Sequence, residues 1–211
     1  MPGLPAALAL LAHDPATGRD RSGGYLDLGL SGAVLFELAL AGRIDLDAKK
    51  VRVLDPAPTG DPLLDARLAA LAADRPRAPH AAVDRGAKGL TRTVRDLLVE
   101  TGDLRRERGR ALGIFPVDRY LPRRGAADDA RTRLASAYRT GRSHDERTDA
   151  LLTLVAAVRL EKAVFPDRDA RPDRKRLKAL AEAHWVGAAV RKAIANRQGA
   201  TAAAASGGGG G

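Results

Sequence analysis

The residues best suited to chemistry in this sequence are cationic, and their spacing suits a phosphate ligand. Lys88, Arg92 and Arg95 follow one another at intervals of four and three residues, which places them on one side of a predicted helix, and Arg85 extends the row by a further three. Arginine binds phosphate through paired N–H donors and lysine binds it as a compact charge. A solvated helix face is the alternative, and the row alone leaves both open.

Apolar and basic residues are mixed over a second stretch, residues 105–124. Leu112, Ile114 and Phe115 lie there among seven arginines and only two acids. The pattern predicts a β-hairpin at about 111–121. At a membrane, the apolar tip would enter the headgroup layer while guanidinium groups pair with lipid phosphates. Two other interpretations stay open: a hairpin packed on the core, and the basic wing of a winged-helix protein that contacts DNA phosphates.

The sequence offers no recognisable catalytic centre. It has no cysteine, which excludes disulfides, thiolate metal sites and a cysteine nucleophile. His13, His80, His144 and His184 are scattered, lack the spacing of a zinc site and are expected at the surface or in capping roles. Neither a Gly-x-Ser-x-Gly elbow nor a Walker loop is present. We therefore expect a protein that is not an enzyme and that holds no metal and no cofactor.

The composition indicates a mainly α protein with phosphate-bearing partners. Of the 211 residues, 45% are hydrophobic and only 3% are aromatic, a mixture that favours helices and allows one sizeable core. The formal net charge of +10 suits lipid headgroups or nucleic acid and does not choose between them. The N-terminal stretch lacks the features of a signal peptide, and the apolar segment 26–41 falls short of the ~20 residues that span a bilayer. We expect a cytoplasmic protein with at most peripheral membrane contact.

The distribution of apolar and helix-breaking residues predicts the elements. Segment 26–41 is apolar on nearly every face, which predicts a central helix wrapped by others, and Gly29 and Gly32 would permit close helix contacts. Alternation about a polar turn predicts a hairpin at about 43–54. Further helices are expected over 4–12, 62–73, 83–101, 128–139, 145–165 and 174–197.

The ends of these elements also follow from residue type. Asp61 before Pro62, and the acidic pairs Asp128/Asp129 and Asp145/Glu146, are expected to cap helix starts. A single domain is expected over 1–198. The Ala/Ser/Gly-rich stretch 199–211 is expected to be disordered.

Three stretches resemble the Golgi phosphoprotein 3 family, peripheral membrane proteins that bind phosphatidylinositol 4-phosphate and have actinobacterial relatives. The stretches are Gly29–Gly32 running into Glu37–Ile44, then Ala57–Asp65, then Leu98–Gly102. The resemblance covers about residues 4–198. It implies a helical bundle wrapped by amphipathic helices, with a protruding hairpin that inserts into the membrane and falls here on Ala111–Leu121.

The resemblance also implies where the lipid phosphate would bind. In the Golgi members, a tryptophan, an arginine and a pair of arginines contact the phosphate. Those positions fall here on Ser22, on Ser31, and on Lys88 with Thr91, so only Lys88 keeps a positive charge. Arg92 and Arg95 could rebuild a looser anion site.

Together these features predict a non-catalytic, adaptor-like peripheral protein at the inner face of the membrane. The lipid phosphate is expected at Lys88, Arg92, Arg95, Ser22 and Ser31, and the inserted side chains are expected to be Leu112, Ile114 and Phe115. The expected partners are an anionic lipid of the phosphoinositide class and a protein cargo, with self-association through the hairpin as a further option. The alternatives are a winged-helix-like DNA-binding regulator, with nucleic acid the less favoured ligand, and a soluble protein-interaction scaffold.

Overall fold

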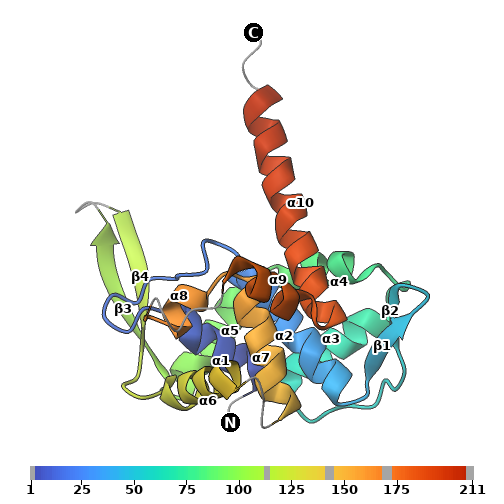
Figure 1. Cartoon of the computed structure of the whole chain (residues 1–211), viewed down its shortest axis with the longest axis horizontal. Helices are drawn as coiled ribbons and strands as arrows, with labels where there is room; N and C mark the ends of the chain where they lie inside the picture. The colour runs from blue at the N-terminus through green and yellow to red at the C-terminus, as the bar shows by residue number, and fades with distance from the viewer. Residues whose placement is uncertain (1–2, 112–114, 141–144, 168–172, 208–211) are drawn as a thin grey trace.

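The computed structural model describes residues 3–111, 115–140, 145–167 and 173–207, and helices make up most of this part of the chain (Figure 1). The expected mainly α fold with two small hairpins is confirmed. The helices are α1 Leu4–Ala12, α2 Leu26–Leu40, α3 Pro62–Ala72, α4 Pro79–Ala87, α5 Leu90–Glu100, α6 Asp128–Thr140, α7 Glu146–Ala157, α8 Glu161–Val164, α9 Arg174–Glu182 and α10 Trp185–Gly207. The strands are β1 Ile44–Asp47, β2 Lys50–Val53, β3 Leu104–Ala111 and β4 Phe115–Pro122.

Helix α2 forms the centre of the core, as its apolar sequence predicted. Every residue from Leu28 to Leu38 is buried, and α1, α4, α7 and α10 all pack against this helix. Two glycines allow the close approach. A Cβ on Gly29 would lie 2.7 Å from Val158 Cγ1, and one on Gly32 would lie 2.4 Å from Val190 Cγ2, so neither position tolerates a side chain without movement of its neighbour.

The two hairpins differ in extent. In the first, β1 pairs with β2 from Ile44 opposite Val53 to Asp47 opposite Lys50, as expected. The second was predicted too short. It begins at Leu104, which pairs with Pro122, and its strands have eight residues each. Its first strand carries exposed arginines on both faces, so it lacks the apolar alternation by which a strand is recognised in a sequence.

Three predicted long helices are each two helices. Gly89 adopts a left-handed φ of 77° and separates α4 from α5, so the expected helix 83–101 is wrong. Arg159, with φ 61°, separates α7 from α8, and the chain turns between α9 and α10 at Ala183 and His184. A glycine inside a helical pattern costs only about 1 kcal/mol, so Gly89 alone did not signal a break.

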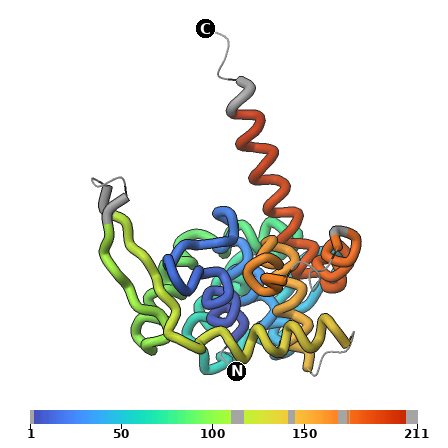
Figure 2. The backbone as a smooth tube through the Cα atoms, turned by 60° about the vertical axis from the view of Figure 1, so that its left-hand side comes forward, coloured from blue at the N-terminus to red at the C-terminus, as the bar shows by residue number. Residues whose placement is uncertain are grey.

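The C-terminal stretch was expected to be disordered from residue 199, but α10 continues to Gly207. Val186 and Val190 are buried in the core and hold the first turns of α10 in place. The alanines that follow can extend this helix, because alanine has the highest helix propensity. Residues 208–211 lie outside the described part of the chain. Figures 1 and 2, which differ by a 60° turn, both show the C-terminal half of α10 and the β3–β4 hairpin standing away from the helical body.

Two predicted caps are formed. Asp61 accepts hydrogen bonds from the backbone N–H groups of Leu63 at 2.8 Å and Leu64 at 3.3 Å. Asp145 accepts one from Thr148 N at 2.8 Å. Each carboxylate therefore satisfies donors that the first helical turn leaves unpaired.

Candidate anion-binding surface

The β3–β4 hairpin is a basic projection. Residues 104–122 hold five arginines and two acids. Both acids are paired within the hairpin, because Arg105 contacts Glu107 at 2.7 Å and Arg106 contacts Asp118. The side chain of Val117 is 41% exposed on β4. Leu112 and Ile114, and the side chain of Phe115, lie outside the described residues.

The hairpin is held to the body at its base. Tyr120 on β4 lies under the guanidinium of Arg95, with Cζ 4.8 Å from the ring centroid, and meets the His13 ring edge-on at 6.1 Å. The loop after α1 lies against the same strand, since a Cβ on Gly18 would be 2.9 Å from Tyr120 N. Leu104 is buried at the start of β3. Contacts from α1, the following loop and α5 therefore fix the direction in which the hairpin projects.

Arg95, predicted to contact phosphate, is already engaged. Its Nε donates to His13 Nε2 at 2.9 Å, and a terminal nitrogen donates to Asp20 Oδ2 at 3.3 Å. His13 lies 2.6 Å from Ala9 O through Nδ1, so Nδ1 carries the proton and Nε2 the lone pair that accepts from Arg95. Burial lowers the pKa of His13 and favours this neutral ring. Arg95 therefore connects the hairpin to the body.

Two histidines have the expected capping role. His13 is buried, with 1% of its surface exposed, but it is the C-cap residue of α1, and its ring donates to Ala9 O in the last turn of that helix. His184 also caps a helix, because its Nδ1 accepts from Val186 N at 3.2 Å in the first turn of α10. His144 lies outside the described residues.

Lys88 and Arg92 do not share a helix face with Arg85. Lys88 follows α4 with ψ 120°, Gly89 turns the chain, and Arg92 belongs to the first turn of α5. The predicted row of four cations is therefore broken after Arg85. Lys88 and Arg92 are both exposed, and neither makes an ion pair within the described part of the chain.

The two serines at the family's phosphate positions are buried. Ser31 is 1% exposed and donates its hydroxyl to Val83 O at 2.7 Å, which joins α2 to α4. Ser22 is 3% exposed, and its backbone N–H donates to Asp20 Oδ1 at 2.8 Å. Asp20 thus brings Ser22 and Arg95 together, whereas Ser31 lies under α4. Five cavities among the described residues are lined by none of Ser22, Ser31, Lys88 and Arg95.

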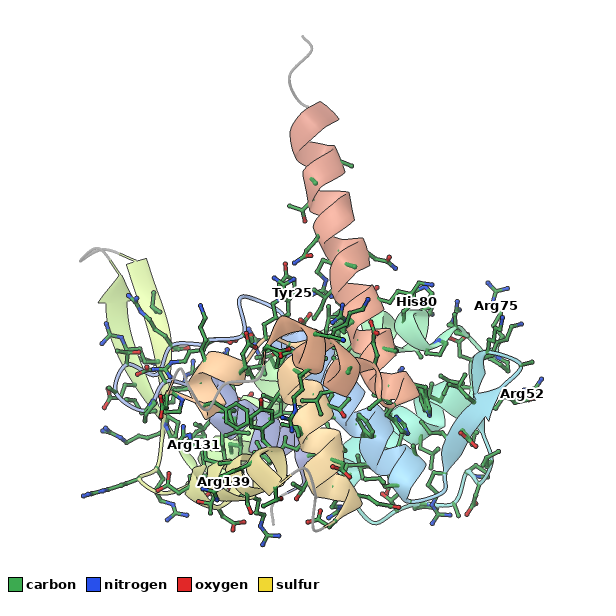
Figure 3. All side chains as sticks on the ribbon, viewed as in Figure 1. Tyr25, Arg52, Arg75, His80, Arg131 and Arg139 are labelled. Carbon is green, nitrogen blue, oxygen red and sulfur yellow. The ribbon has the colours of Figure 1, made fainter. Side chains whose placement is uncertain are left out.

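Tyr25 precedes α2 and lies beside the base of the projecting part of α10 (Figure 3). Its hydroxyl accepts a hydrogen bond from Gln198 Nε2 at 3.0 Å. The aromatic ring is partly buried against the core. Tyr25 therefore helps to hold α10 at its exit from the body.

Sequence reasoning missed the residues that hold Arg95. His13 and Asp20 precede it by 82 and 75 residues, and Tyr120 belongs to a strand of the hairpin. No spacing within one element could link them. Only the folded structure shows that these residues contact Arg95.

Two general properties bear on the chemistry. Within residues 3–111, 115–140, 145–167 and 173–207, no group of three or more histidine, aspartate or glutamate side chains is arranged to hold a metal ion. Over the same residues, none of the helices combines the length and the apolar character needed to cross a membrane.

Comparison with known families accounts for almost the whole chain. A search of curated proteins finds no match. The family model described as Golgi phosphoprotein 3 (GPP34) matches residues 4–197. This range runs from α1 into α10 and takes in both hairpins and all three stretches that carry the resemblance. The chain therefore belongs to the Golgi phosphoprotein 3 (GPP34) family.

Proposed function

We propose that this protein is a non-catalytic peripheral membrane protein that binds anionic phospholipid of the phosphoinositide class at the inner face of the membrane. The observation that carries the proposal is the basic β3–β4 hairpin, which projects from the body (Figures 1 and 2). A projection of this kind can reach the headgroup layer while the helical body stays in water. The membrane-facing side would then be the side toward which the hairpin points.

Electrostatic attraction supplies the first part of the binding. Residues 104–122 carry five arginines against two acids, an excess of three positive charges. Each basic group adds about 1 kcal/mol near an anionic leaflet, so three are worth on the order of 3 kcal/mol. Lys88 and Arg92, which are exposed, would add to this attraction.

Apolar insertion supplies the second part. Val117 is exposed on β4, and the apolar residues Leu112, Ile114 and Phe115 shortly precede it in the sequence. Each buried CH₂ group gains about 0.8 kcal/mol on leaving water. The contact of Tyr120 with Arg95 and His13 would keep the base of β4 at a fixed angle to the body.

Flotation with liposomes tests the proposal. Vesicles of neutral phosphatidylcholine are compared with vesicles that also contain phosphatidylserine or phosphatidylinositol 4-phosphate. The wild-type protein is expected to float only with the anionic vesicles. Phe115→Asp and Val117→Asp are expected to lose most of this binding, whereas the matched control Leu54→Asp, which changes a side chain 62% exposed outside the hairpin, keeps it. Equal flotation of Val117→Asp and wild type would contradict hairpin insertion.

The two alternative functions make different predictions. A DNA-binding regulator should retard a random duplex at low salt and release it at high salt, because released counterions drive that contact. A protein-interaction scaffold should melt at the same temperature with and without a soluble phosphoinositide. Flotation with anionic vesicles, together with no mobility shift at low salt, would favour the lipid proposal over both.

A further inference from the structure

A cluster of arginines lies at the junction of α3 and α4, away from the hairpin. Arg67 belongs to α3, Arg85 to α4, and Arg75 and Arg77 to the linker between these helices. All four line one small cavity together with a single acid, Asp74. Figure 3 shows Arg75 at the edge of the body across from the hairpin.

Asp74 engages only part of this charge. Arg77 donates to its two carboxylate oxygens at 2.6 and 3.1 Å, and Arg85 Nε lies 3.4 Å from one of them. The hydrogen bond from Arg77 lowers the pKa of Asp74 to about 2, so the carboxylate is ionised at neutral pH. Four guanidinium groups against one carboxylate leave an excess of three positive charges among the described residues that line the cavity.

Arg67 is partly buried. One terminal nitrogen donates to Ala82 O at 2.6 Å, while Nε is buried and has no hydrogen-bond partner among the described residues. Burial lowers the pKa of this guanidinium, and Asp74 opposes the change. A Cβ on Gly86 would lie 3.0 Å from Arg67 Cζ, so the glycine leaves room for the group. A buried charged donor without an acceptor is costly, and an oxoanion would supply the acceptor.

The cavity can admit part of a ligand only. Its volume of about 20 Å³ is little more than one water molecule requires. One oxygen of a phosphate group fits this space, and the other oxygens would remain at the mouth. The side chain of Arg85 is 60% exposed there and can meet them.

We propose that Arg67, Arg77 and Arg85 form a binding site for a phosphate dianion, and that Asp74 is an internal carboxylate which the ligand displaces from the arginines. The site does not depend on the hairpin, so the protein would bind phosphate here even if the hairpin did not bind membranes. The phosphate can come from a lipid headgroup or from a soluble phosphate compound. Both present the same terminal oxygens to the cavity.

Titration with inorganic phosphate at constant ionic strength tests the site, with the arginine Nε–Hε signals in ¹⁵N NMR spectra as the readout. Phosphate is expected to shift the signals of Arg67, Arg77 and Arg85, and chloride is not. Asp74→Asn removes the internal competitor and is expected to bind phosphate about tenfold more tightly, whereas Arg85→Gln binds it about fivefold more weakly. Arg52→Gln on β2 is the control and should keep the wild-type affinity.

Two results would overturn the site. If Asp74→Asn gains no affinity, the arginines serve only to hold Asp74. If Arg52→Gln weakens binding as much as Arg85→Gln does, the effect comes from net charge alone.

Vesicles distinguish the sources of the phosphate. If Asp74→Asn prefers vesicles with phosphatidylinositol 4-phosphate to phosphatidylserine vesicles of equal charge more strongly than the wild type does, the ligand is a headgroup. Phosphate binding in solution without that preference assigns a soluble ligand. Val117→Asp is expected to lose vesicle binding and keep phosphate binding, so failure of the hairpin and failure of the cavity give different results.

Discussion

The two hairpins of this protein share an antiparallel connection and differ in what covers them. In β1–β2, Ile44 and Val51 are buried, and Val51 N donates to Arg77 O at 2.8 Å in the linker before α4. In β3–β4, Leu104 is buried at the base, while Val117 is exposed further out. The first hairpin is part of the core, and the second touches the core only where it begins.

This difference indicates what each hairpin contributes. An isolated two-stranded hairpin is marginally stable in water, so β1–β2 gains its stability from the helices that cover it. The outer part of β3–β4 has no such cover within the described part of the chain. Its residues can therefore change without great loss of folding stability, which leaves them available for binding.

The same substitution should lower folding stability in the first hairpin and vesicle binding in the second, and this is the largest difference we expect. Val51→Asp buries a carboxylate and should lower the free energy of unfolding by about 3 kcal/mol or more. Val117→Asp should change it by less than about 0.5 kcal/mol and reduce vesicle binding instead. Urea unfolding of both variants measures the difference. Equal destabilisation would show that β3–β4 is as much a part of the core as β1–β2.

Removal of the contact at the base should loosen the second hairpin. Tyr120→Ala deletes the ring under Arg95 and is expected to cost about 1–2 kcal/mol of unfolding free energy and to weaken vesicle binding. Tyr138→Ala is a matched control, because Tyr138 lies under Arg176 at 4.1 Å on a different part of the surface. It should cost similar stability and leave vesicle binding unchanged. Loss of binding in both variants would mean that stability, not hairpin direction, limits the interaction.

The neutral His13 makes the base of the hairpin sensitive to acid. Burial holds its pKa below the unfolded value of 6.5, so below pH 6.5 the unfolded chain takes up a proton that the folded chain does not. Unfolding free energy should therefore fall by about 1 kcal/mol between pH 7.5 and 5.5. Urea unfolding at the two pH values measures it.

His13→Gln should flatten this pH dependence. Burial also lowers the pKa of His184. His184→Gln should therefore remove a separate part of the pH dependence, and the double variant should remove both parts. An unchanged slope in His13→Gln would exclude His13 as the source.

The smallest effect should come from the ion pair between Arg106 and Asp118 on the hairpin surface. Exposed pairs contribute little to stability, so Asp118→Asn should unfold like the wild type. The variant adds one positive charge to the hairpin, and binding to anionic vesicles should rise a few-fold, with a steeper dependence on salt. Binding that stays constant would argue against a direct contact between the hairpin and the anionic surface.

Patterns along single elements predicted the fold well. The apolar run of α2 and the alternation of Ile44, Leu46, Val51 and Val53 each reflect burial of a continuous segment, and such burial leaves a periodic trace in the sequence. The breaks at Gly89 and Arg159 left no comparable trace, because one left-handed residue is enough to end a helix.

The candidate site was predicted less well because its contacts join distant segments. Arg95 was recognised as a cation, but its partners come from α1, the loop after it and β4. The arginines near Asp74 come from two helices and a linker, and spacing placed only Arg85 among the candidates. Residue type indicates a charge, whereas only the folded chain determines what neutralises it.

The close approach of Gly18 to Tyr120 has a consequence for how this family diverges. With φ 64° and a neighbouring backbone nitrogen 2.9 Å from where a Cβ would stand, position 18 accepts only glycine while the loop rests on β4. Homologues that keep this contact should retain the glycine through long evolutionary drift. Those that lose it should also have altered the length or tilt of the hairpin, so the two segments would be inherited as one unit.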